Sequence, residues 1–154
     1  MEALLKELTA ELPDTTQIAR IAIRLAAAAI LGAVIGIQRE SAGKAAGLRT
    51  HMLVALGASL FVLISLEFGM SSSDLSRVIQ GLATGIGFIG GGAILKLTKE
   101  REITGLTTAA GIWLTAAVGV AVGVGRWWLA TLSVVLTWII LTAIGKIEFR
   151  NKKR

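Results

Sequence analysis

Three glycines near the middle of the chain have a spacing that could hold a phosphate. Gly85, Gly87 and Gly90 spell G-x-G-x-x-G, the pattern that holds a dinucleotide pyrophosphate in Rossmann folds. That chemistry needs a strand before the motif, a helix that begins within it and an acidic residue about 20 positions later. Here the motif lies midway through an apolar stretch, where a phosphate would be stranded in hydrocarbon. We therefore expect no nucleotide at these glycines.

Other residue types that carry chemistry are scarce. The chain has no cysteine and a single histidine, His51, which excludes thiolate chemistry and any metal site with two histidine ligands. There is no serine elbow, phosphate loop or metal cluster, so the sequence predicts neither an enzyme nor a bound cofactor. Glu67 and Asp74 are the candidates for a Mg²⁺ site, because Mg²⁺ takes one or two carboxylates and keeps several waters. Nothing in their spacing demands a metal.

The composition indicates that these residues are positioned by membrane helices. Hydrophobic residues make up 54% of the 154 residues and charged residues 17%, whereas a soluble domain carries about 25% charge. The mean hydropathy is +0.73. A helix crosses a bilayer with about 20 mainly apolar residues. We predict one all-α domain over residues 18–147, a bundle of about five transmembrane helices with spans at 18–37, 50–68, 78–97, 106–124 and 127–147.

Two short segments flank this domain, and the charges assign its orientation. Residues 1–13 are typical of an amphipathic helix lying on the membrane, and residues 148–154 form a basic tail. Five spans put eleven basic and four acidic residues at one end of the bundle, and five basic and six acidic residues at the other. Basic residues gather in cytoplasmic loops, so we predict the N-terminus outside and the C-terminus inside. The positive charge then requires no nucleic acid.

Glycines in the third span admit two interpretations. Glycine costs about 1 kcal/mol relative to alanine in a helix interior, and this span has six: Gly81, Gly85, Gly87, Gly90, Gly91 and Gly92. Small residues let membrane helices approach closely, so the first interpretation is helix packing. The second is that the backbone unwinds at residues 90–92, as it does at ion sites in transporters.

Arg24 is an ionisable residue inside the first span, and such residues are functional candidates. One interpretation is that its side chain reaches the headgroups. The other is that it pairs with Glu67 or Asp74, which are predicted to lie at the same outer end of the bundle.

Three polar residues of the third span, Arg77, Gln80 and Thr84, fall on one helical face. This stripe could line a polar crevice, or Gln80 and Thr84 could hydrogen-bond to neighbouring helices.

Polar residues also gather at the predicted cytoplasmic ends of three spans. We expect a network there, formed by Arg39, Glu40, Arg49, His51, Thr107 and Thr108. The alternative is that the arginines are positive-inside anchors and that Thr107 or Thr108 caps a helix. Glu40 favours the network, since an acid is out of place among purely basic anchors.

These residues lie in four motifs that resemble the hydrophobic domain of the MgtC/SapB family. In order along the chain they are GAVIGIQRE, AGLRTHMLVALGASLF, SRVIQGLATGIGFIGGGAIL and ITGLTTAAGIWLTAAVGVAVGVG. The resemblance runs from about residue 24 to 125 and extends more loosely through the fifth span. It implies a protein of the bacterial inner membrane with about five spans. Longer members carry a cytoplasmic C-terminal domain, and this chain resembles the short members without it.

The resemblance also implies a role in low-magnesium growth and in virulence, through restraint of partners such as the membrane ATP synthase. We therefore expect a regulatory or accessory protein that contacts other membrane proteins in the bilayer, and a homo-oligomer, with a dimer as the simplest form. The alternative is an oligomeric transporter or channel for a cation, Mg²⁺ or H⁺, or for a small solute.

Overall fold

A computed structural model describes Met1 and residues 14–97 and 102–144 of the chain. It confirms the predicted all-α bundle. The described helices are α2 (Thr15–Ser41), α3 (Leu48–Glu67), α4 (Ser72–Gly92), α5 (Leu106–Val124) and α6 (Trp127–Ile139), and α6 continues into a π-helical turn, η1 (Ile140–Ile144). The predicted amphipathic segment 2–13 and the basic tail 148–154 lie outside the described residues.

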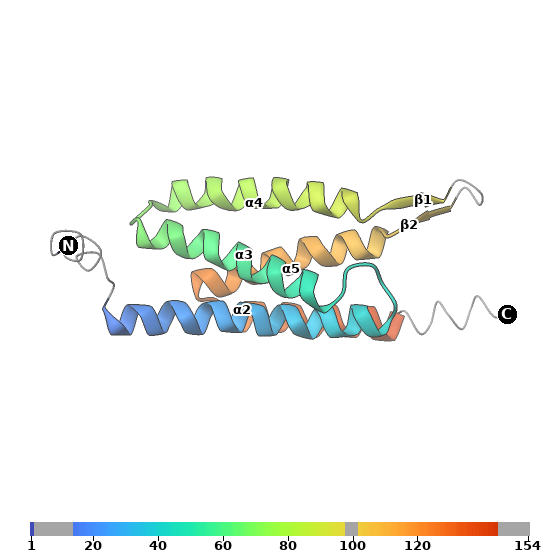
Figure 1. The fold of residues 1–154 in the computed structure, drawn as a ribbon, viewed down its shortest axis with the longest axis horizontal. Helices are drawn as coiled ribbons and strands as arrows, with labels where there is room; N and C mark the ends of the chain where they lie inside the picture. The colour runs from blue at the N-terminus through green and yellow to red at the C-terminus, as the bar shows by residue number, and fades with distance from the viewer. Residues whose placement is uncertain (2–13, 98–101, 145–154) are drawn as a thin grey trace.

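Successive helices run in alternating directions (Figure 1). Helices α2, α3 and α5 pack against one another in the middle of the bundle, α6 lies against α2 and α5, and α4 lies against α5 with a smaller contact to α3. By length and composition, α2, α3 and α5 can each cross a bilayer. Helix α4 has a similar length, but its charged residues Asp74 and Arg77 and its six glycines make it less apolar.

The third helix ends earlier than the sequence predicts. We expected a span over residues 78–97, whereas α4 begins at Ser72 and ends at Gly92. The backbone therefore stays helical through residues 90–92, and the N–H groups of Ala93 and Ile94 close its last turn on Gly90 and Gly91. Residues after it form an antiparallel hairpin of β1 (Leu95–Leu97) and β2 (Glu102–Thr104), in which Lys96 pairs with Ile103.

Glycine allows the bundle's centre to pack closely. A Cβ atom on Gly36 of α2 would stand 2.7 Å from the Leu48 Cα, and one on Gly123 of α5 would stand 2.8 Å from the Val62 Cβ. A Cβ on Gly119 would overlap the carbonyl oxygen of Ala55. We call this contact of α2 and α5 with α3 the glycine seam. It includes Gly32, Gly36, Gly119 and Gly123.

We predicted that the α4 glycines allow close helix packing. For contacts within the chain, this prediction is wrong for most of them. A Cβ on Gly90 would stand 3.6 Å from Ala109 of α5, an ordinary contact. At the other positions a Cβ would meet no atom of the described residues within 4 Å, and these are Gly81, Gly85, Gly87, Gly91 and Gly92. The reason is the position of α4 at the edge of the bundle, where a single face touches other helices (Figure 1).

Candidate functional site

A buried arginine lies at the end of the bundle where α2 stops and α5 starts. Arg39, in the last turn of α2, is 3% exposed, and its Nη2 donates a hydrogen bond of 3.1 Å to Oγ1 of Thr108 in α5. A buried charge costs several kcal/mol unless it is paired or hydrogen-bonded. A chain therefore keeps such an arginine at a considerable cost in stability, which marks the position as a functional candidate.

The single histidine lies near Arg39 and belongs to the same buried region. His51 of α3 is fully buried, and its Nδ1 lies 2.7 Å from Oγ1 of Thr115 in α5. The Thr115 hydroxyl also lies 2.8 Å from the carbonyl of Gly111, one turn earlier in the same helix. Which of the two atoms donates in the contact between His51 and Thr115 depends on the tautomer of the histidine ring.

Arg39, His51, Thr108 and Thr115 together form what we call the polar cluster. Two of its buried nitrogen atoms, Arg39 Nε and His51 Nε2, have no hydrogen-bond partner among the described residues. Buried polar groups are nearly always satisfied, so each of these two nitrogen atoms can hydrogen-bond to a water or to another polar group. The described residues contain no group of three or more His, Asp or Glu side chains that could hold a metal ion.

Two of the predicted network residues, Arg39 and Thr108, make a direct hydrogen bond, and His51 lies in the same cluster. Glu40 does not join them. Its Oε2 accepts the backbone N–H of Leu48 at 2.8 Å, so it satisfies a free donor at the start of α3. A Cβ on Gly47 would stand 2.7 Å from that oxygen, so a larger residue there would displace the Glu40 carboxylate.

The remaining members of the predicted network, Arg49 and Thr107, are exposed. The prediction of one six-residue network is therefore wrong in its extent. Sequence reasoning missed Thr115. The available signal was its distance of seven residues from Thr108, which places both threonines on one face of a helix.

At the opposite end of the bundle, Arg24 caps a helix. Its Nη1 donates to the carbonyl of Gly123 at 2.8 Å, close to the C-terminus of α5, where free carbonyls and the helix dipole favour a cation. The predicted pairing of Arg24 with Glu67 or Asp74 is not seen. Instead, Glu67 accepts a hydrogen bond from Gln17 of α2.

Asp74 is engaged in the first turn of α4. Its carboxylate accepts a hydrogen bond of 2.6 Å from the Ser71 hydroxyl. The backbone N–H of Asp74 in turn donates to Oγ of Ser71 at 3.3 Å. This is a helix N-cap. Hydrogen bonds account for both carboxylates, within α4 for Asp74 and to α2 for Glu67. No third acidic or histidine ligand joins them among the described residues to make a magnesium site.

The polar stripe of α4 forms no crevice with the part of the chain that the structure describes. Arg77, Gln80 and Thr84 are all exposed. The Thr84 hydroxyl donates to the carbonyl of Gln80, one turn earlier in the same helix, at 2.9 Å. Neither of the two predicted roles, a crevice lining or hydrogen bonds to neighbouring helices, is observed.

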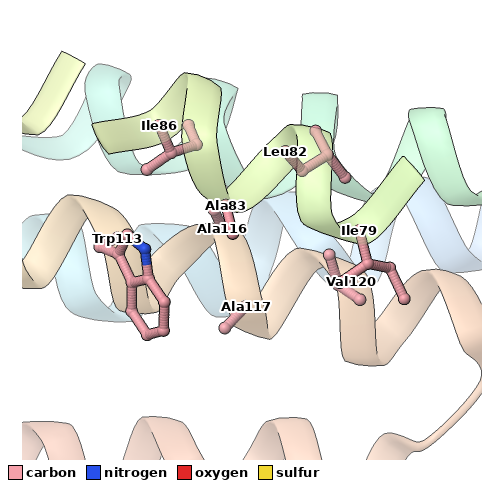
Figure 2. A pocket seen from close by; sticks show the side chains of 8 residues that line it. All are labelled: Ile79, Leu82, Ala83, Ile86, Trp113, Ala116, Ala117 and Val120. Carbon is pink, nitrogen blue, oxygen red and sulfur yellow. The ribbon is translucent and has the colours of Figure 1, made fainter. Parts of the chain in front are cut away.

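The opposite face of α4 contributes to an apolar cavity of about 150 Å³ between α4 and α5. Figure 2 shows Ile79, Leu82 and Ile86 of α4 directed towards α5, which contributes Trp113 and Val120. The lining contains no charged side chain, so the cavity suits an apolar group and not an ion.

The fold and the polar cluster define a helical membrane protein with a buried arginine and histidine at one end of its bundle. Residues 25–150 match the MgtC family, and the chain belongs to this family. No solved structure matches it.

Three relatives illustrate the range of similarity. Protein SrpB of Synechococcus elongatus is 40% identical over 139 residues, which cover 83% of this chain and 76% of SrpB. A protein of Escherichia coli K12 named "Putative magnesium transporter YhiD" is 41% identical over 140 residues, covering 86% of this chain and 64% of YhiD. Protein MgtC of Salmonella typhimurium LT2 is 40% identical over 104 residues, 68% of this chain and 43% of MgtC.

Proposed function

We propose that this protein is a non-enzymatic regulatory or accessory factor of the bacterial inner membrane, which supports growth at low magnesium by contacting other membrane proteins. Membership of the MgtC family and a relative named for magnesium transport support the connection with magnesium. The membrane ATP synthase is one candidate partner.

The glycine seam is the observation that favours regulation over transport. A path for Mg²⁺ or protons through the centre of the chain would have to pass between α3 and α5 beyond the polar cluster. There Gly119 lies so close to the Ala55 carbonyl that a single added carbon would overlap it. Further along the same interface, a Cβ on Gly123 would stand 2.8 Å from the Val62 Cβ. Backbones in direct contact leave no room for a file of waters.

We further propose that the protein crosses the membrane with its N-terminus outside and C-terminus in the cytoplasm, so that the polar cluster lies at the cytoplasmic end. The division of basic residues between the two ends supports this orientation. A reporter fused after Arg154 should be active only as a cytoplasmic reporter, and activity of a periplasmic reporter would refute the orientation.

Growth and flux measurements together test the function. Cells lacking the protein should grow poorly at low magnesium and recover with the wild type. The Arg39→Gln variant should reach the membrane in normal amount but fail to restore growth. Arg49→Gln is the matched control, because Arg49 is an exposed arginine at the same end of the bundle, and it should restore growth. Equal rescue of growth by both variants would show that the function does not need the polar cluster.

The purified protein in liposomes should pass neither Mg²⁺ nor protons above the rate of empty liposomes. A second candidate function, an oligomeric transporter, is favoured by one observation, the exposed polar stripe on α4. In an oligomer that stripe could face a path between chains. Flux that depends on Arg77 would establish this second function and overturn the first.

A further inference from the structure

Helix α4 has one face that the bundle covers and one that it leaves open. Ile79, Leu82 and Ile86 face α5 (Figure 2). The face on the other side is defined by four residues at a spacing of i, i+4, i+7 and i+11, which an α-helix brings into one row: Arg77, Gly81, Thr84 and Phe88. We call this row the open face of α4. Phe88 is 87% exposed, and a Cβ on Gly81 would meet nothing.

The open face is unlike the exposed surface of α2. Along α2, Ile23, Ile30 and Ile37 are 58–62% exposed and present large apolar side chains at every second turn. The open face instead presents a guanidinium, a hydroxyl, a glycine and one aromatic ring. A charged group is costly against lipid, and glycines give lipid chains little surface while they allow another backbone to approach. A helix of another chain suits this face better than lipid does.

The charges on α4 identify that chain as a second copy. Residues follow one another at about 100° around an α-helix, so Asp74 and Arg77 flank the line through Gly81 and Phe88 on opposite sides, one turn apart. Two copies inserted in the same direction are related by a two-fold axis along the membrane normal, which makes their α4 helices parallel. The axis then places Asp74 of each copy beside Arg77 of the other. Arg77 makes no hydrogen bond or ion pair with another described residue of its own chain.

We infer that the protein forms a parallel homodimer through the open face of α4, held by close contact at Gly81 and by two reciprocal Asp74–Arg77 ion pairs between the copies. This pairing is independent of the proposed regulatory function. It uses Gly81, which has no packing role among the described residues, and it covers Arg77 and Thr84 of the exposed polar stripe.

Cysteine cross-linking in native membranes tests the contact, because the chain contains no cysteine of its own. Gly81→Cys and Phe88→Cys, each as a single variant, should form disulfide-linked dimers on mild oxidation. Gly87→Cys is the matched control, since a Cβ there also meets nothing, but the position lies on a different side of the helix. It should stay monomeric. Cross-linking at Gly87 equal to that at Gly81, or none at Gly81 and Phe88, would overturn the inference.

Charge reversal tests the ion pairs. Asp74→Arg and Arg77→Asp should each lower the dimer fraction several-fold, because like charges then face each other across the two-fold axis. The double variant should restore it. Ser71→Ala controls for loss of the helix cap at Asp74 and should leave the dimer fraction unchanged. A double variant as monomeric as the single variants would overturn the ion pairs, and a partner other than a second copy would leave the dimer fraction at zero throughout.

Discussion

The glycines of the central helices and those of α4 have the same spacing but opposite surroundings. Gly119 and Gly123 of α5 follow G-x-x-x-G and lie against the backbone and side chains of α3. Gly81 and Gly85 of α4 follow the same pattern, and a Cβ at either would meet nothing within 4 Å. The motif therefore indicates that another helix can approach the backbone closely. Whether one does depends on where the helix lies in the bundle.

The difference also separates two kinds of task. The glycine seam brings α2 and α5 against α3, and so fixes Arg39 against Thr108 and His51 against Thr115. Glycines there maintain the fold and the polar cluster. The α4 glycines other than Gly90 have no close neighbour among the described residues, and Gly81 is available to a second chain. Substitutions in the two regions should accordingly differ in what they damage.

The largest effect is expected at Gly119. Gly119→Leu forces a side chain into the Ala55 carbonyl of α3, and backbone cannot move aside as a flexible side chain can. Overpacking commonly costs about 1–3 kcal/mol and sometimes more, and we expect a loss at or above the upper end of that range. The free energy of unfolding in detergent, with the yield of folded protein, measures it.

The matched control is Gly85→Leu, which adds the same side chain in open space on α4. Its unfolding free energy should stay close to that of the wild type. If both variants lowered the free energy of unfolding equally, the two sets of glycines would not differ in their role.

A smaller loss is expected when the polar cluster is opened. Thr108→Val keeps the shape of the side chain but removes the acceptor for Arg39 Nη2. Leaving a buried donor unsatisfied costs about 1–3 kcal/mol. A double-mutant cycle with Arg39→Met should then show coupling, because valine at 108 is harmless once the guanidinium is gone. Additive losses would show that the hydrogen bond contributes nothing to stability.

The sequence predicts the helices well because each is a long apolar segment in its own right, and the polar ends of α2, α3 and α5 could be recognised as a group. It could not distinguish Glu40 from Arg39. Both lie at the end of α2, but Arg39 is buried against α5 and Glu40 points to the first N–H of α3. Side-chain direction of this kind depends on how three helices meet, which no local pattern contains.

The glycines of α4 show the same limit more clearly. Their number predicted close packing, but at five of the six an added Cβ would meet no atom of the described residues within 4 Å. A stretch of small residues carries no information about its neighbours, so the sequence could not reveal that α4 lies at the edge. The end of α4 was missed for another reason. Leu95 and Leu97 extend the apolar pattern beyond Gly92, but residues 95–97 pair with residues 102–104 as a hairpin.

A smaller effect still is expected at the other end of the bundle. Arg24→Met removes the donor to the Gly123 carbonyl at the C-terminus of α5. A cation in such a position contributes about 0.3–1 kcal/mol, and up to ~2 kcal/mol where it is partly buried. Arg20→Met is the control, because Arg20 lies one turn earlier in α2 and is exposed. Thermal unfolding should show a decrease for Arg24→Met alone, and equal decreases would assign the effect to membrane anchoring.

The smallest effect, and the one opposite in sign, is expected at Gly87. An alanine there adds a methyl group in open space, on a side of α4 away from both α5 and the open face. Because alanine is better than glycine in a helix interior by about 1 kcal/mol, Gly87→Ala should leave the unfolding free energy unchanged or raise it by up to that amount. Dimer cross-linking through Gly81→Cys should not change in the same background. If Gly87→Ala instead destabilised the protein, α4 would have a neighbour on that side as well, and its glycines would resemble those of α5 after all.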